Sequence, residues 1–119
     1  MNKRFLAVLG ACACLLALPA EARSPYDGQW DITFVTQSGN CGAVYHYSVM
    51  IENGVITSPA VQSFHGKVSN AGVVRATVSL QEQRATGAGR LTGVVGRGTW
   101  TGYSADQRCA GAWTARRAW

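Results

Sequence analysis

Apolar and polar residues alternate in short runs along most of the chain, and this pattern limits its possible folds more than any other feature. In the first run, Trp30, Ile32 and Phe34 share one face, because successive side chains of a strand point to opposite sides. Turn-forming residues separate the runs at the spacing typical of an all-β sandwich or barrel. We therefore predict about eight short strands, at residues 30–36, 44–52, a run from 55, 63–68, 73–80, 84–92, 98–103 and 108–116.

Asn53 and Gly54 predict a tight turn between the second and third runs. Both central residues of a two-residue hairpin loop need positive φ, which asparagine and glycine tolerate. This loop pairs Ile51 with Ile56 and keeps both on one face, as a buried face requires. Pro59 then interrupts the third strand, since proline cannot donate a hydrogen bond to its neighbour.

The N-terminus, residues 1–22, has the pattern of a secretory signal peptide. A positively charged start precedes an apolar run at residues 5–18, and small residues follow it. We therefore expect an exported chain with a single β-domain at residues 23–119, in which no apolar stretch is long enough to predict a transmembrane segment. An alternative is a lipobox that ends at Cys12 and would place a lipid anchor there.

Removal of the predicted signal peptide leaves two cysteines, Cys41 and Cys109. A pair of cysteines in an exported chain predicts a disulfide, because the compartments outside the cytoplasm are oxidising. Closing so long a loop would stabilise the fold by about 4 kcal/mol. For a domain this small, that is a large share of the total stability.

The two ends of the domain also bear on its topology. In an up-and-down meander with an even number of strands, closure makes the first and last strands antiparallel neighbours. The two cysteines would then share one rim, and Gly28 and Trp30 would meet Arg116 and Arg117 at the other. We therefore expect a small antiparallel up-and-down barrel, with a strongly coiled sandwich as the alternative.

Glycines alternate with larger residues through residues 87–102 and lie close to a tryptophan. Glycine in a strand permits tight bends and the close approach of a large ring to neighbouring backbone. A barrel of eight short strands has room either for its own side chains or for one small ligand. The inward aromatic volume favours a filled core. The aromatic residues assigned to the interior are Trp30, Phe34, Tyr45, Tyr47, Phe64 and at least one of Trp100 and Trp113.

The charge of the chain is unevenly distributed. The formal net charge of +5 falls to +4 without the signal peptide, because Lys3, Arg4 and Glu21 leave with it. Most remaining cations follow residue 66. A basic face could bind an acidic partner or a lipopolysaccharide surface, or could serve only solubility. The cations do not interleave with stacking aromatics, so no nucleic-acid partner is expected.

Residue types that would support catalysis are scarce. His46 and His65 are the only histidines, and by alternation both point outward from strands that another strand separates. Two separated histidines are too few ligands for a closed zinc site, and no catalytic triad or carboxylate pair stands out. We therefore expect a non-enzymatic protein without a metal or cofactor. Haem ligation by His46, beside Tyr45 and Tyr47, is an alternative.

Two resemblances follow from the motifs. The stretch Gly28, Gln29, Trp30, with an arginine near the end of the final strand, resembles the calycin barrels (lipocalins and avidins), in which an arginine packs across that tryptophan. A second pattern, YDGQW, a later cysteine, IENG, GxGxL, GTWxG and CxGxW, spans nearly all of residues 26–117. It resembles a group of small exported proteobacterial proteins of unassigned function. These resemblances imply export and a β-fold but no particular chemistry.

Three functions are compatible with these features. The first is an inhibitor-like protein-binding module of the cell envelope, which predicts a filled barrel. The second is a carrier of a small apolar ligand or haem, which predicts a cavity. The third is a purely structural envelope protein. The candidate contact residues for a binding surface are Arg84, Arg90, Arg97, Tyr103, Arg108 and Trp119.

Overall fold

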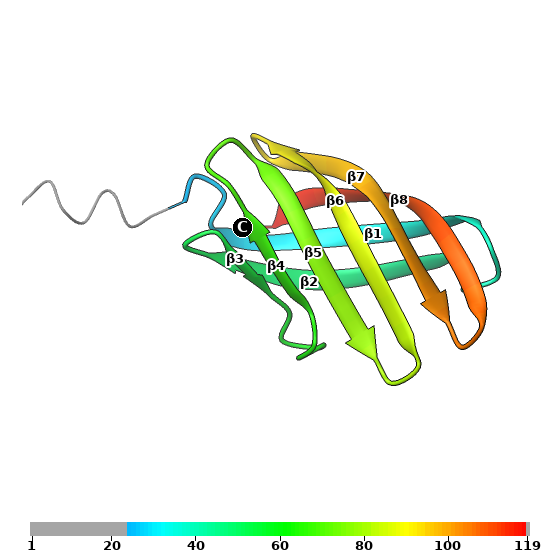
Figure 1. Ribbon diagram of the computed structural model, residues 1–119. Helices are drawn as coiled ribbons and strands as arrows, with labels where there is room; N and C mark the ends of the chain where they lie inside the picture. Colours follow the sequence, from blue (N-terminus) through cyan, green and yellow to red (C-terminus); the bar gives the residue numbers. More distant parts are fainter. Residues whose placement is uncertain (1–23, 119) are drawn as a thin grey trace, which may run out of the picture.

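The computed structural model describes residues 24–118, which form eight antiparallel strands closed into a barrel (Figure 1). Each strand pairs with the next in the chain, and β8 pairs with β1. The barrel prediction is therefore confirmed, and the sandwich alternative is wrong. The predicted signal peptide and Cys12 lie outside the described residues. The strands are β1 (Gly28–Ser38), β2 (Val44–Glu52), β3 (Val55–Thr57), β4 (His65–Val68), β5 (Val73–Leu80), β6 (Gln83–Thr92), β7 (Val95–Ser104) and β8 (Gln107–Ala118).

The contact between β1 and β8 closes the barrel. Trp30 lies opposite Arg117 in the register, and the Arg117 guanidinium lies 5.0 Å from the centre of the Trp30 ring, within reach of a cation–π interaction. The Trp30 indole donates a hydrogen bond to the Tyr26 carbonyl oxygen at 2.9 Å. Arg116 instead lies exposed opposite Asp31, and Gly28 pairs with β2. Of the two arginines, Arg117 therefore carries the contact with the tryptophan.

The hairpin between β2 and β3 has the predicted register. Ile51 pairs with Ile56, and both are buried. Asn53 and Gly54 have φ values of 54° and 78°, in the left-handed region that this turn requires. The Asp27 carboxylate accepts hydrogen bonds from their backbone N–H groups at 2.9 and 3.3 Å. Although burial alone raises the pKa of Asp27, these hydrogen bonds lower it below its ordinary value.

The two ends of the barrel differ in packing. We call the end at which β1 begins the closed end; the turns at residues 53–54, 69–72 and 93–94 lie there. We call the opposite end, with the turns at 81–82 and 105–106, the open end. Four of the most deeply buried side chains lie toward the closed end. They are Trp30, Val49, Ile51 and Ile56, which are 1–3% exposed.

The glycine-rich strands make room for Trp113 inside the barrel. Gly98 pairs with both Gly89 and Trp113, so two glycines lie beside one indole. A Cβ atom at position 98 would lie 2.6 Å from Trp113 Cε2, a distance that real structures do not tolerate. Trp113 is 4% and Trp100 6% exposed. Both tryptophans therefore fill the core, and the alternation of glycine with larger residues is what admits them.

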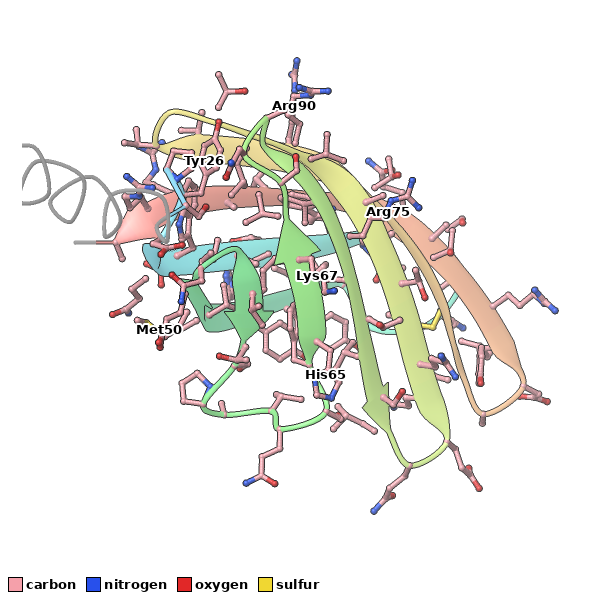
Figure 2. All side chains as sticks on the ribbon, turned by 60° about the vertical axis from the view of Figure 1, so that its left-hand side comes forward. Tyr26, Met50, His65, Lys67, Arg75 and Arg90 are labelled. Atoms are coloured by element: carbon pink, nitrogen blue, oxygen red, sulfur yellow. A yellow bond between two sulfur atoms is a disulfide. The ribbon has the colours of Figure 1, made fainter. Side chains whose placement is uncertain are left out.

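The outer wall carries polar and charged side chains, as the alternation predicts. His65 and Lys67 of β4 and Arg75 of β5 are exposed, and Figure 2 shows them on the outer wall. Phe64 and Val68 are buried on the other side of the same segment. In the described part of the chain, no helix is long and apolar enough to span a membrane.

Candidate binding site at the open end

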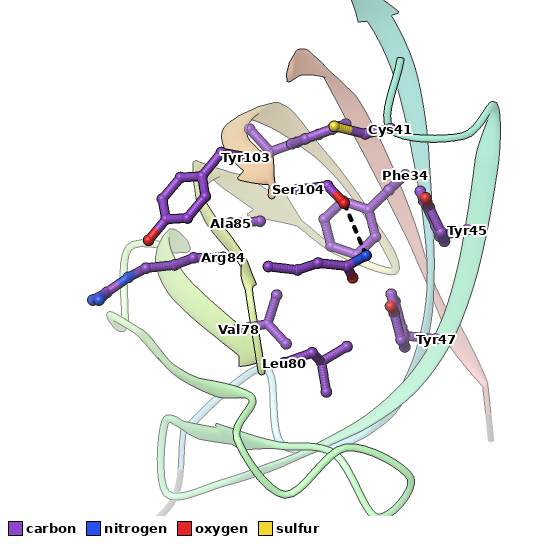
Figure 3. A pocket seen from close by; sticks show the side chains of 12 residues that line it. Phe34, Cys41, Tyr45, Tyr47, Val78, Leu80, Arg84, Ala85, Tyr103 and Ser104 are labelled. Atoms are coloured by element: carbon purple, nitrogen blue, oxygen red, sulfur yellow. Dashed lines mark hydrogen bonds between the residues drawn. The ribbon is translucent and has the colours of Figure 1, made fainter. Parts of the chain in front are cut away.

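A pocket of about 90 Å³ lies at the open end of the barrel (Figure 3). Its walls come from β1 and β2 on one side and from β5, β6 and β7 on the other. Aromatic and aliphatic side chains dominate the lining. The lining residues are Phe34, Cys41, Tyr45, Tyr47, Val78, Leu80, Gln83, Arg84, Ala85, Trp100, Tyr103 and Ser104.

Aromatic rings form the inner wall of the pocket. The Phe34 ring lies edge-on to Tyr47 and to Trp100, with centroid distances of 5.7 and 6.4 Å. These edge-to-face arrangements are favourable for aromatic pairs. Trp100 is held in turn by a hydrogen bond from its indole N–H to the Val35 carbonyl oxygen, at 3.2 Å. The inner wall is therefore preorganised.

Tyr47 brings a hydroxyl group into this apolar wall. Burial raises the pKa of the Tyr47 hydroxyl, and the neighbouring Tyr45 raises it further. The group therefore stays protonated through the neutral range and can donate a hydrogen bond. Across the pocket, the Gln83 side-chain amide donates to the Ser104 hydroxyl at 3.0 Å. Polar groups are thus present among the apolar side chains, as in sites that bind a specific partner.

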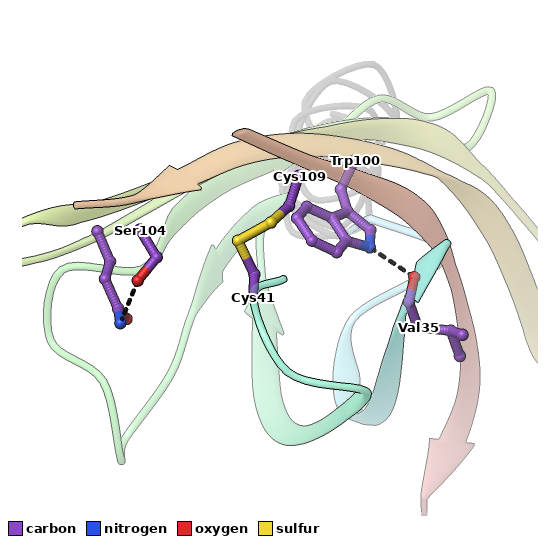
Figure 4. Close-up of a disulfide and its surroundings, with 6 residues drawn as sticks. Val35, Cys41, Trp100, Ser104 and Cys109 are labelled. Carbon is purple, nitrogen blue, oxygen red and sulfur yellow. Dashed lines mark hydrogen bonds between the residues drawn. A yellow bond between two sulfur atoms is a disulfide. The ribbon is translucent and has the colours of Figure 1, made fainter. Parts of the chain in front are cut away.

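The disulfide anchors the loop after β1 to the pocket (Figure 4). Cys41 bonds to Cys109, with the Cα atoms 6.1 Å apart, so the disulfide prediction is confirmed. Gly39 has a φ of 88°, and a Cβ there would lie 2.7 Å from the Cys109 sulfur. Cys109 is buried at 4% exposure, whereas Cys41 is only partly buried. The disulfide therefore connects the exposed loop to the core.

Tyr45 lies less deeply than predicted. It points to the inner side with Tyr47, as the alternation requires, but it is 40% exposed and does not fill the core. The reason is that β3 and β4 have only three and four residues, so the wall beside β2 is short at the open end. Leu80, across the pocket, is 43% exposed for the same reason.

The structure divides the predicted contact residues between the two ends. Arg84, Tyr103 and Arg108 lie side by side across β6, β7 and β8 at the open end, and the first two line the pocket. Arg90 and Arg97 pair with each other nearer the closed end. Trp119 lies outside the described residues.

The two histidines do not enter the pocket. His46 is exposed, and its Nδ1 lies 3.1 Å from the Thr33 hydroxyl. His65 is exposed on β4. Among residues 24–118, no group of three histidine, cysteine or acidic side chains is arranged to hold a metal ion. Because neighbouring residues of a strand point to opposite sides, His46 faces away from Tyr45 and Tyr47, which line the pocket.

Sequence reasoning missed several pocket residues. Val78, Leu80, Gln83 and Ser104 line the pocket but are not among the contact residues predicted from the sequence. The signal that could have indicated them is the interruption of the third strand at Pro59. An interrupted strand leaves one side of the barrel short and exposes the side chains that face the gap.

The chain matches no protein-family model, curated protein or solved structure. The resemblances to calycins and to small exported proteobacterial proteins therefore stay predictions.

Proposed function

We propose that this chain is an exported, non-enzymatic protein-binding module of the cell envelope that acts as an inhibitor-like protein. The observation that supports this function best is the exposed apolar lining of the open end. Tyr45 and Leu80 on the inner side of this end are 40% and 43% exposed, and Tyr103, on the outer side of its rim, is 47% exposed. Tyrosine is enriched among the residues that dominate binding energy at protein interfaces.

The size of the pocket favours a partner's side chain over a free small molecule. Pockets that enclose drug-sized ligands have volumes of about 300–1,000 Å³, whereas this pocket has about 90 Å³. The space inward of it is taken by Phe34 and Trp100. In our proposal, one apolar side chain of a partner protein enters the pocket while the rim contacts the surrounding surface.

The rim supports specificity as well as contact. Arg84 and Arg108 flank Tyr103 in the register, and Glu82 and Asp106 lie in the two adjoining turns. A rim of both charges around an apolar centre is the usual arrangement of a protein interface. We therefore expect the partner to present an apolar side chain surrounded by charged residues.

Site-specific photo-cross-linking tests the proposal. A photoreactive phenylalanine analogue replaces Tyr103, or in a control Thr99, which is exposed on the same strand but farther from the open end. We expect position 103 to form an adduct with one host envelope protein that position 99 does not form. The partner, once identified by mass spectrometry, should bind the Tyr103→Ala variant about 30-fold more weakly.

Two results would contradict the proposal. Equal adducts from positions 103 and 99 would show contact without a defined site. A small apolar compound that co-purifies with the protein and is displaced by a Val78→Trp substitution would instead support the carrier function. Val78 lines the pocket, so a larger side chain there would fill the space such a compound needs.

A further inference from the structure

The outer wall of the barrel carries a repeated pattern of valine and cations. In the register of β3 to β8, three rows of neighbouring outward residues each begin with an exposed valine and continue with arginine or lysine. The rows are Val55–Lys67–Arg75, Val73–Arg90–Arg97 and Val95–Arg116. We call these residues the valine–cation face.

The valines of this face gather at the closed end. Val55 follows the turn at residues 53–54, Val73 follows the turn at 69–72, and Val95 follows the turn at 93–94. They are 47%, 38% and 42% exposed, and Val94 in the last of these turns is 43% exposed. Four exposed valines therefore lie along the side of this end formed by β3 to β7, next to the cations.

The cations of the face lie opposite one another. Lys67 pairs with Arg75, and Arg90 pairs with Arg97. Like charges directly opposite each other in a sheet are destabilising. A bound anion would relieve this repulsion. Figure 2 shows Lys67 and Arg75 on the wall that faces the viewer and Arg90 at its upper edge.

The two ends also differ in charge. At the open end, Arg84 and Arg108 lie close in sequence to Glu82 and Asp106. The cations of the valine–cation face have a single acidic residue, Asp31, as a direct neighbour in the register, and it pairs with Arg116. Two further acids lie at the closed end, since Glu52 pairs with Val55 and Asp27 binds the turn at residues 53–54. Among the described residues, the five cations of the face still outnumber the three acids of this end, whereas two cations and two acids balance at the open end.

We propose that the valine–cation face docks the closed end of the barrel on a bilayer surface rich in anionic phospholipid. Exposed apolar side chains that enter the boundary between headgroups and acyl chains, with cations at the headgroup level, are the arrangement by which proteins lie on membranes. Long arginine and lysine side chains can reach the phosphates while their stems stay beside apolar groups. An extended anionic polysaccharide would be held by the cations alone and would leave the exposed valines unused.

This orientation is independent of the proposed partner site. Docking through the closed end directs the pocket away from the bilayer, because the pocket lies at the opposite end of the barrel. A membrane-bound chain could therefore still bind a protein through its open end.

Vesicle co-sedimentation tests the docking. The full chain is isolated from its host, and mass spectrometry establishes its N-terminus. It is then mixed with vesicles of phosphatidylcholine alone or of equal parts phosphatidylcholine and phosphatidylglycerol. We expect binding only to the anionic vesicles and a loss of most binding between about 0.05 and about 0.5 M salt, as the Debye length shortens. A double variant, Lys67→Gln with Arg75→Gln, should bind about 25-fold more weakly, at about fivefold per cation.

A matched variant controls for net charge. Arg84→Gln with Arg108→Gln removes the same charge from the open end and should leave vesicle binding within about twofold of the original protein. Replacement of Val94 and Val95 by serine should weaken the binding to anionic vesicles although no charge changes. Equal losses from the two charge variants, or full binding by the serine variant, would overturn the proposal. Binding to a soluble anionic polysaccharide but not to vesicles would also overturn it.

Discussion

The two ends of this barrel are built from the same alternating strands but differ in how deeply their side chains are buried. At the closed end, Trp30 and Val49 are each 1% exposed, and a cation–π contact with Arg117 closes the sheet. At the open end, Tyr45 and Tyr103 are 40% and 47% exposed around a small pocket. The comparison shows that a small domain can bury its side chains deeply at one end and leave apolar side chains exposed at the other.

The difference between the ends follows from strand length. Strands β5 to β8 have eight to twelve residues and extend the full height of the wall, whereas β3 and β4 have three and four. Beside the short strands, Phe64 is buried from the connecting segment and fills part of the missing wall. The gap that remains is the pocket.

The largest expected effect is that of Trp30→Ala. The substitution removes a fully buried indole and its hydrogen bond to Tyr26, and we expect it to lower the free energy of unfolding by about 4 kcal/mol. Tyr103→Ala at the open end should lower it by less than about 0.5 kcal/mol. Urea unfolding followed by tryptophan fluorescence measures both. Similar losses for the two variants would show that the ends do not differ as described.

The second effect is that of the disulfide. Cys41→Ser with Cys109→Ser should lower the free energy of unfolding by about 3 kcal/mol. The bond closes a loop with a sequence separation of 68 residues, and measured losses are commonly somewhat smaller than the chain-entropy value of about 4 kcal/mol. Calorimetry of the oxidised protein and the double variant measures this difference. A loss below about 1 kcal/mol would mean that the disulfide serves mainly to position the pocket loop.

A pair of glycine substitutions tests the packing of Trp113. Gly98→Ala should lower the free energy of unfolding by about 2 kcal/mol, since the new methyl group would overlap both the indole and the Ala88 carbonyl oxygen. Gly87→Ala is the matched control, because a Cβ there would make ordinary contacts of 3.5 Å or more. It should change the stability by less than about 1 kcal/mol. Equal effects would show that Trp113 and the Ala88 backbone can both move to accommodate a side chain.

The smallest predicted effect concerns Asp27. Because hydrogen bonds lower its pKa below the ordinary value of 3.8, the carboxylate stabilises the fold fully above that pH and loses the effect as the pH falls through its lowered pKa. Asp27→Asn should lower the free energy of unfolding by about 1 kcal/mol at neutral pH. The difference between the proteins should vanish in acid. A constant difference in urea unfolding across the pH range would contradict this role.

Much of the fold could be predicted because alternation has a strict physical meaning. Side chains two residues apart share a face, so the buried positions of β1, β4 and β5 follow from the pattern alone. The Asn53–Gly54 turn set the register of one hairpin. The even number of strands and the two cysteines then indicated closure, which the structure confirms.

The depth of each residue along the barrel could not be predicted in the same way. Tyr45 and Val49 share a face of β2, yet Tyr45 is 40% and Val49 1% exposed. The difference depends on how far β3 and β4 extend beside them, and this depends on long-range packing of the segment around Phe64. Alternation assigns residues to faces, but it says nothing about the height of the neighbouring wall.

Hydrogen exchange measured residue by residue tests the contrast between the ends most directly. Ile51 and Val78 are a matched pair, since each lies on the inner face of a hairpin close to its turn, one at each end of the barrel. We predict that the region around Ile51 exchanges only through global unfolding, whereas the region around Val78 opens locally and exchanges about a hundredfold faster. Equal protection of the two hairpins would contradict the account, because the barrel would then open as a single unit.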